Sequence, residues 1–342
     1  MKVINAISYR LGLNKFFGKF EKYENTICHF DTSITSLNVG DEIINDSGSK
    51  QIKTFFSDKQ ILKAATHDKI SSRGIHRANL CECRLVCGSN ILTNNLLGND
   101  NWNISPLEIL RLNKLILMGV GWNKYNEKVG LATKVLYRML LSKEGFHSVR
   151  DEYTKEKLAE IGINNVINTG CPTMWGLTPE HCNNVPVSKA RSVVFTLTDY
   201  GPSIERDKEL IKVLTDNYEK LYFWPQGNRD MKYLHSLGIK CDDIVIIPPQ
   251  LSAFDNFLSK NDVDFIGTRL HGGIRALQHK RRTLIVAIDN RAIEKGKDFN
   301  LPVIHRDDVA NKLQTLIDGE IVTKIKLKTD NIEKWKGQFH EK

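Results

Sequence analysis

Short apolar runs alternate with amphipathic stretches along most of the chain. In the first half, apolar runs predict buried strands at residues 26–30, 84–86, 114–119, 146–149 and 166–168. Helical spacing of apolar residues predicts helices that begin near residue 41 and that cover 128–141 and 152–161. This alternation is typical of an α/β domain built on a mainly parallel sheet.

A second alternating series follows a polar segment that holds Pro179 and Pro186. Its predicted strands are 192–198, 221–224, 244–247, 264–267 and 283–288. Its predicted helices are 204–217, 231–237, 251–259, 272–279 and 307–318, with a terminal helix at 330–342. We therefore expect an α/β protein with two Rossmann-like, doubly wound domains that face a cleft. Ligands of such domains bind at the carboxyl ends of the strands.

The same pattern predicts the domain boundaries. The expected segments are a basic amphipathic segment at 1–25, an N-terminal domain at 26–177, a linker at 178–190, a C-terminal domain at 191–320 and a helical extension at 321–342. In segment 1–25, apolar residues from Val3 to Phe20 recur near helical spacing among lysines and Arg10. Two interpretations stay open: a surface helix docked on the first domain, or a basic amphipathic helix on an anionic membrane.

Composition narrows the class of protein. The chain has 342 residues, which suits two domains, and no apolar run approaches the roughly 18–20 residues of a membrane span. Its seven scattered cysteines fit reduced cytoplasmic thiols better than a disulfide framework. The net charge of +9 suits anionic partners. Because no zinc-finger, RNP or phosphate-loop pattern accompanies that charge, we do not expect nucleic acid to be a partner.

The most informative motif is Thr268-Arg269-Leu270-His271-Gly272-Gly273, which follows a predicted strand. The strand passes into a helix within a few residues, so His271 and the amides of Gly272 and Gly273 are expected at a helix N-terminus, which attracts anions. Arg269 adds a fixed positive charge, and His271 can exchange a proton near neutral pH. The alternative is a core histidine beside a surface arginine.

Two further motifs follow predicted strands of the first domain. Asn38-Val39-Gly40-Asp41 combines a glycine turn with a carboxylate at a helix start, and Asp41 could serve only as an N-cap. Ser148-Val149-Arg150-Asp151 places an arginine where it could hold a carboxylate or a phosphate with a bidentate fork. Its alternative is a helix cap at Asp151 with a surface ion pair at Arg150.

Weaker candidates also follow predicted strands, and loop filler is their default interpretation. They are Gly88-Ser89-Asn90, Gly119-Val120-Gly121, Trp224-Pro225-Gln226 and Asp289-Asn290-Arg291. Cys81-Glu82-Cys83 with Cys87 resembles half of a metal site, but no second ligand cluster follows at ligand spacing. We therefore expect no metal.

Taken in order, these motifs resemble the polysaccharide pyruvyltransferase family. The resemblance rests on Asn38-x-Gly40-Asp41, Gly88, Ser148–Asp151, Thr169-Gly170-Cys171-Pro172 and Arg269-Leu270-His271-Gly272, and it covers roughly residues 26–320. Cys171 stands where the family often has aspartate. The resemblance implies a fold similar to glycosyltransferase-B, with an acceptor-side N-terminal domain and a donor-side C-terminal domain.

The resemblance also implies the chemistry, a pyruvyl transfer from phosphoenolpyruvate to a glycan that forms a pyruvate ketal. Arg150 and Arg269 would hold the donor, with Leu270, Gly272 and Gly273 beside it. His271 would transfer a proton, and Asp41 would activate the acceptor hydroxyl. Further cleft contacts to the acceptor are expected from Asn38, Gly40, Ser89, Asn90, Gln226, Asn290 and Arg291. No cofactor is implied, because phosphoenolpyruvate is a co-substrate.

Two other functions stay open at this point. A glycosyltransferase of the same architecture would bind a nucleotide sugar with the same arginines and helix N-terminus. A non-catalytic binding protein of a glycan-assembly complex would keep the fold without the charged residues. The expected location is the cytoplasm, and the protein could also associate peripherally with the inner face of the cytoplasmic membrane. The acceptor sugar, the surface polymer and the oligomeric state are not predicted.

Overall fold

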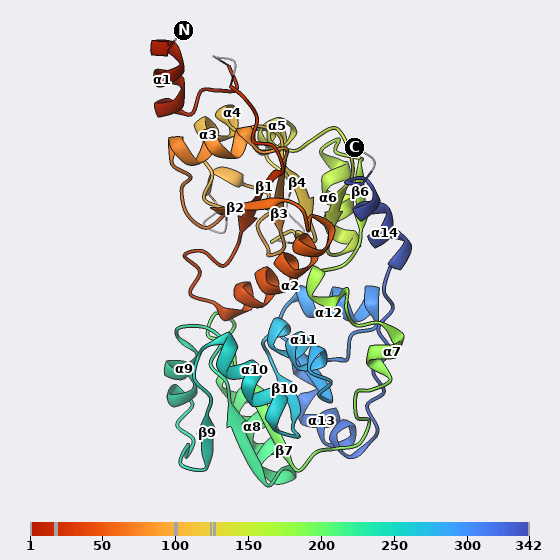
Figure 1. Ribbon diagram of the computed structural model, residues 1–342. Coiled ribbons are helices and arrows are strands. Elements are labelled where there is room, and N and C mark those ends of the chain that lie inside the picture. Colours follow the sequence, from red (N-terminus) through yellow and green to blue (C-terminus); the bar gives the residue numbers. More distant parts are fainter. Residues whose placement is uncertain (1, 17–19, 99–101, 124, 126–127, 341–342) are drawn as a thin grey trace. The chain divides into compact units, whose positions relative to one another are not determined.

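The computed structural model describes residues 2–16, 20–98, 102–123, 125 and 128–340 (Figure 1). The chain forms two compact units. Unit 1 comprises Met1–Ser36, Ile44–Pro172 and Lys328–Lys342, and unit 2 comprises Leu37–Ile43 and Thr173–Leu327. Both units alternate strands with helices around parallel sheets, which confirms the predicted α/β class with two Rossmann-like domains.

Unit 1 is built on a four-stranded parallel sheet in the order β2-β1-β3-β4. Its strands are β1 (Thr26–Asp31), β2 (Gln60–Ala65), β3 (Cys83–Cys87) and β4 (Ile116–Met118). A parallel pair, β5 (His147–Val149) and β6 (Val166–Asn168), joins through a bridge between Val120 and Val149. The helices are α1 (Lys2–Leu11), α2 (Val39–Phe55), α3 (Ser72–Leu80), α4 (Pro106–Arg111), α5 (Leu131–Leu140), α6 (Glu152–Glu160) and α14 (Thr329–Gly337). The part of α2 up to Ile43 belongs to unit 2.

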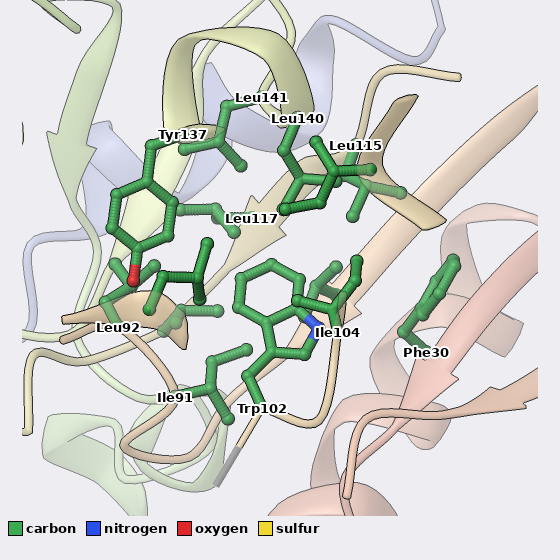
Figure 2. Close-up of a cluster of buried hydrophobic side chains, with 14 of the residues drawn as sticks. Phe30, Ile91, Leu92, Trp102, Ile104, Leu115, Leu117, Tyr137, Leu140 and Leu141 are labelled. Atoms are coloured by element: carbon green, nitrogen blue, oxygen red, sulfur yellow. The ribbon is translucent and has the colours of Figure 1, made fainter. Parts of the chain in front are cut away.

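The core of unit 1 explains why its apolar runs form strands. Every residue of β1 is buried, as expected for a strand with neighbours on both sides. Figure 2 shows Trp102 and Tyr137 packed among leucines of β4 and α5, and both aromatic side chains are at most 1% exposed. The hydroxyl of Tyr137 accepts a hydrogen bond from the amide of Thr93 at 2.9 Å, so this buried polar group is satisfied.

Unit 2 is built on a six-stranded parallel sheet in the order β12-β11-β10-β7-β8-β9. The strands are β7 (Ser192–Thr196), β8 (Lys220–Phe223), β9 (Ile244–Ile246), β10 (Asp264–Gly267), β11 (Thr283–Ala287) and β12 (Val303–His305). The helices are α7 (Pro179–Cys182), α8 (Ile204–Asn217), α9 (Asp230–Ser236), α10 (Leu251–Lys260), α11 (Leu270–Gln278), α12 (Asn290–Phe299) and α13 (Val309–Asp318). The chain runs outward in one direction from β7 to β9 and in the other from β10 to β12. The strand order therefore switches between β7 and β10, where ligands of such sheets bind.

The two faces of this sheet pack into separate cores. Val194 of β7 joins a buried cluster with side chains of α10 and α11, whereas Val193 and Phe195 join one with side chains of α8 and α13. This alternation follows from the two-residue period of a strand. It accounts for the continuous apolar runs that predicted these strands.

The unit boundaries differ from the predicted domain boundaries in three places. Leu37–Ile43 belongs to unit 2, although the sequence suggested the N-terminal domain. The predicted linker at 178–190 lies inside unit 2, where the ring of His181 in α7 hydrogen-bonds the carbonyl oxygen of Leu277 at 2.8 Å. The predicted C-terminal extension divides. Its residues to Leu327 belong to unit 2, and α14 belongs to unit 1, where Trp335 is fully buried.

Several elements were not predicted at all. Short strands β2 and β12 and helices α3, α4 and α12 lack a long apolar period, so sequence pattern alone did not identify them. The N-terminal helix α1 docks on α3, as the surface-helix interpretation expected. Ser8 is buried, and the ring centroids of Tyr9 and His76 lie 4.5 Å apart, whereas Ile7 and Leu11 are 52% and 48% exposed.

An ion pair of unit 2 makes stability depend on pH. Burial alone would raise the pKa of Asp255, but hydrogen bonds of 2.6 Å from Nε and Nη2 of Arg275, with His279 nearby, lower that pKa to about 2. Because the folded pKa lies below the unfolded one, the contribution is present above pH 4 and is lost as the pH falls toward 2. Asp255→Asn should therefore lower the free energy of unfolding by about 1–2 kcal/mol at pH 7. Urea titrations at pH 7 and pH 3 should show that the deficit shrinks at the lower pH.

Candidate active site

The candidate site in unit 2 is centred on the junction between β10 and α11. β10 ends at Gly267, as predicted, and α11 begins at Leu270, two residues before the predicted start, with Arg269 as its N-cap. His271 lies in the first turn of the helix and is 9% exposed. The junction lies beside the switch between β7 and β10. Leu270 is also buried, at 8% exposure, and packs in the core cluster beneath the helix.

Arg269 is held by two carboxylates that the sequence did not identify. Its Nη2 donates to Oδ1 of Asp199 at 2.9 Å and to Oδ1 of Asp230. Its Nε donates to Oδ2 of Asp230 and to the carbonyl oxygen of Leu197, both at 3.1 Å. The arginine is 2% exposed and Asp230 is fully buried. The alternative of a surface arginine is therefore wrong, because Arg269 forms a buried ion pair with these two carboxylates.

Asp230 also holds the loop after β8 in position. Its Oδ2 accepts hydrogen bonds from the amides of Gln226 at 3.0 Å and Gly227 at 2.7 Å. Burial raises the pKa of Asp230, and the charge and hydrogen bonds of Arg269 oppose that rise. The carboxylate thus depends on Arg269 to remain ionised in the interior.

The Asn38–Asp41 segment is bound to this loop and lies in unit 2. Asn38 pairs with Gly227 in an antiparallel bridge, and the amide of Val39 donates to the carbonyl oxygen of Gln226 at 2.9 Å. Oδ1 of Asn38 accepts from Nε2 of Gln226 at 2.9 Å and from the amide of Gly40 at 3.0 Å. Asp41 follows in the first turn of α2 and is 8% exposed. The structure therefore brings the Asn38 motif and the His271 motif into one unit.

Gln226 lies between these two motifs. A methyl group added at Gly272 would lie 3.1 Å from Oε1 of Gln226, so the glutamine amide contacts the first turn of α11. The residue is 4% exposed, and no donor among the described residues reaches Oε1. A buried acceptor of this kind normally has a partner. It therefore marks a place for a ligand hydroxyl or a water molecule.

Gly273 has a structural role that differs from the predicted one. Its amide donates to the carbonyl oxygen of Arg269 at 3.1 Å, so it closes the first turn of α11 and is not available to a bound anion. A methyl group at this position would overlap the side chain of Ile285 and press on Phe265. Close packing of α11 on β10 and β11, and not the approach of a ligand, requires glycine here.

Arg291 and Asn290 lie at the carboxyl end of β11. Asn290 is the first residue of α12, and Asp289 caps that helix. The guanidinium of Arg291 pairs with Asp289 and donates to the hydroxyl of Tyr200, and the Tyr200 ring lies 5.4 Å from Arg291 and 5.0 Å from Arg269. Tyr200 therefore links the two arginines by cation–π contacts.

Arg150 occupies the corresponding edge of the sheet in unit 1. It follows β5, is 2% exposed, and its Nε donates to Oδ2 of Asp151 at 2.9 Å. Asp151 also caps α6 by accepting from the amide of Thr154 at 2.8 Å. Nη2 of Arg150 is buried and has no hydrogen-bond partner among the described residues. The expected helix cap at Asp151 is confirmed, whereas the alternative of a surface ion pair at Arg150 is wrong.

Glycine shapes the space around Arg150. Gly121, in the loop after β4, leaves room for the guanidinium, because a methyl group there would overlap Nε and Cζ of Arg150. The amide of Gly121 donates to the carbonyl oxygen of Ser89 at 2.9 Å, which ties the loop after β3 to the loop after β4. Ser89 adopts a left-handed backbone with φ 60°, and Asn90 follows it in the same loop. Of these two predicted residues, Ser89 therefore supports the loop that packs on Arg150.

Sequence reasoning missed Asp199, Tyr200 and Asp230. Each follows or lies near a strand end, but only their contacts with Arg269 distinguish them from other polar loop residues. Among the described residues, no group of three or more His, Cys, Asp or Glu side chains could hold a metal ion.

A family model for polysaccharide pyruvyl transferase matches residues 38–290. The chain belongs to this family. The match includes Asn38, Arg150 and the Arg269–Gly273 motif, and it extends over most of both units. No curated protein matches the chain significantly.

Three solved structures are similar to this chain at low identity. S. aureus MnaA in a co-structure with UDP is 12% identical, with 86% of this chain and 87% of that one covered and a TM-score of 0.45. Methanocaldococcus jannaschii UDP-GlcNAc 2-epimerase, in complex with UDP-GlcNAc and UDP, is 10% identical over 92% and 96%, with a TM-score of 0.46. A further UDP-N-acetylglucosamine 2-epimerase is 11% identical over 93% and 91%, with a TM-score of 0.47.

Proposed function

We propose that this pyruvyl transferase takes its pyruvyl group from phosphoenolpyruvate and transfers it to a sugar of a cell-surface polysaccharide or of its lipid-linked precursor. The product would be a pyruvate ketal. The observation that carries the proposal is the buried guanidinium of Arg150, whose Nη2 has no hydrogen-bond partner among the described residues. Membership of a pyruvyl transferase family supports the same reaction. Nε of Arg150 pairs with Asp151, which leaves Nη2 for a carboxylate or phosphate oxygen of the donor.

Phosphoenolpyruvate presents a carboxylate and a phosphate on a three-carbon frame. We assign contact with one of these groups to Arg150, through Nη2. Arg269 already pairs with Asp199 and Asp230. We therefore assign its positive charge to holding the first turn of α11 and the Gln226 loop in place for the donor. In this assignment Arg269 does not bind the donor directly and is a positioning residue.

The transfer needs a proton at C3 of the donor and loss of protons from two acceptor hydroxyls. We assign the donation at C3 to His271, which lies in the first turn of α11. Asp41 would accept the proton of the first hydroxyl as its oxygen bonds to C2. The C2–O bond to phosphate then breaks, and the second hydroxyl closes the ketal as it loses its proton.

Gln226 is assigned to the acceptor sugar. Its buried Oε1 accepts no hydrogen bond from the described residues and lies beside Gly272, so an acceptor hydroxyl could donate to it. Asn38 and Gly40 fix the glutamine amide from the other side. Loss of this hydrogen bond should raise KM for the acceptor more than KM for the donor.

A thermal-shift measurement tests the donor. Phosphoenolpyruvate at about one hundred times its Kd should stabilise the protein by about 2.7 kcal/mol. Arg150→Ala should lose this stabilisation because the cationic fork is removed. Gly121→Ala should lose most of it because the added methyl group displaces the same guanidinium. Gly130→Ala is the matched control, since a methyl group there meets no atom closer than 3.6 Å.

The same assay includes a panel of nucleotide sugars. Stabilisation by a nucleotide sugar without any response to phosphoenolpyruvate would contradict pyruvyl transfer from this donor. The proposed function would then be glycosyl transfer. A response to phosphoenolpyruvate that survives in Arg150→Ala would show that the arginine assignment is wrong. We place the reaction in the cytoplasm, where phosphoenolpyruvate is formed, and at the inner face of the membrane when the acceptor is lipid-linked.

A further inference from the structure

One end of unit 1 is formed by helices that contact one another. α1 packs on α3 and α4 packs on α5. Nη1 of Arg111 in α4 donates to the carbonyl oxygen of Leu11 in α1 at 2.6 Å, which joins the two pairs. Nζ of Lys15 adds a second link of 2.8 Å to the carbonyl oxygen of Leu112. Figure 1 shows the four helices together at the end of the unit where the chain begins.

Six large apolar side chains of α1, α4 and α5 are exposed. We call them together the apolar face, and they are Ile7, Leu11, Leu107, Leu110, Leu131 and Val135. Leu131 is 81% exposed, and Val135, one helical turn later in α5, is 55% exposed. Soluble proteins rarely expose such patches unless a partner or a membrane covers them. This face therefore needs an occupant.

The charge around the apolar face indicates which occupant fits. The only acidic residue in α1, α3, α4 and α5 is Glu108. It is buried, and its carboxylate accepts from Ser105 and from the amide of Ile70. Arg10, Arg73 and Arg77 of the same helices are exposed. The face thus presents positive charge without compensating negative charge on its own helices.

A basic pocket lies beside α3, one of the same helices. It has a volume of about 290 Å³ and lies between α3 and the edge strand β2, where Lys63, Lys69, Arg73 and Arg77 line it. The guanidinium of Arg73 lies 5.5 Å from the ring centre of Tyr9, so the pocket is next to α1. Lys63 pairs with Asp31, whereas Lys69 and Arg77 are exposed at its rim. The pocket suits a phosphate group.

We infer that this end of unit 1 docks on an anionic membrane. The apolar face enters the boundary between headgroups and acyl chains, and the arginines and lysines contact lipid phosphates, with one phosphate in the basic pocket. Among the described residues, no helix is long and apolar enough to span a membrane, so the contact is peripheral. The charge complementarity selects anionic lipid. This inference concerns lipid binding and does not depend on the identity of the donor.

Vesicle flotation of the full chain tests the inference. Vesicles of phosphatidylcholine with about 30% phosphatidylglycerol should retain the protein, and pure phosphatidylcholine should not. Leu131→Asp/Val135→Asp should reduce the partition coefficient about tenfold or more, and Arg73→Glu/Arg77→Glu should do the same. The control is Ile204→Asp/Val322→Asp, which changes two residues of unit 2 with 51% and 52% exposure.

The outcomes separate lipid binding from the alternatives. Equal flotation of the wild type and both surface variants would overturn the inference. The molecular masses of the wild type and of Leu131→Asp/Val135→Asp are measured as well. A lower mass for the variant with unchanged flotation would also overturn the inference, because the face would then bind a second copy of the chain. Stabilisation by phosphoenolpyruvate is measured on the same variants. It should persist in all of them, so that failure of lipid binding and failure of the proposed function give different results.

Discussion

Replacing His271 by alanine is expected to lower kcat for pyruvyl transfer by about 10²–10⁴-fold, the range that a positioned general acid supplies. The histidine lies in the first turn of α11 and is 9% exposed, so the free energy of unfolding of the variant is measured beside kcat. Stabilisation by phosphoenolpyruvate should change little, because the cationic groups remain. The plot of kcat against pH should lose the limb that depends on the histidine. If His271 had only a structural role, its removal would leave the shape of that plot unchanged.

The controls for this prediction are on the same helix. His271→Asn keeps a polar side chain but cannot donate the proton, so it should be as slow as the alanine variant. His279→Ala changes the C-cap of α11, where the ring lies 3.2 Å from Asp255, and should retain kcat. A normal kcat for His271→Ala in a folded protein would remove the histidine from the proposed proton transfer.

Replacing Arg269 by alanine should destabilise unit 2 by about 3–5 kcal/mol, because it leaves a buried carboxylate without its counter-ion. Asp230 is fully buried, and Asp199 loses a partner at 2.9 Å. The effect should reach the site through Asp230, which holds the amides of Gln226 and Gly227 and thereby the Asn38 segment. We therefore expect activity to fall even at temperatures at which the variant remains folded.

A double-mutant cycle measures this coupling by urea denaturation. Asp230→Ala/Arg269→Ala should cost clearly less than the sum of the two single variants, because neither charge is then left alone in the interior. Arg206→Ala is the control. Its ion pair with Asp307 has a similar length of 2.7 Å, but both side chains are about half exposed, so its loss should cost about 0–1 kcal/mol. Additive single effects at Arg269 and Asp230 would contradict the proposed network.

The strand and helix series was predictable because local patterns determine it. The predicted helix at 204–217 and the predicted strand at 264–267 coincide with α8 and β10. Long amphipathic helices and buried parallel strands carry their period within a few turns or residues. Short elements such as β12 and α4 carry too little of it, and their neighbours in the fold stabilise them.

The motif residues were also visible in the sequence, because each follows a strand of a parallel sheet. The family match at 38–290 confirms the resemblance that these motifs carried. The sequence could not show that Asn38–Asp41 belongs with unit 2, since that placement depends on a bridge to Gly227, almost two hundred residues further along the chain.

By itself, the sequence determined the α/β class, the order of the longer helices and strands and the family, because hydrophobic period and strand-end motifs are local properties of the chain. Only the tertiary structure decided which charges meet. Arg269 is neutralised by Asp199 and Asp230, whereas Nη2 of Arg150 is buried without a partner among the described residues. The two arginines look alike in sequence, and long-range packing gives them different electrostatic roles, since a buried charge depends on the groups that folding places within a few ångströms.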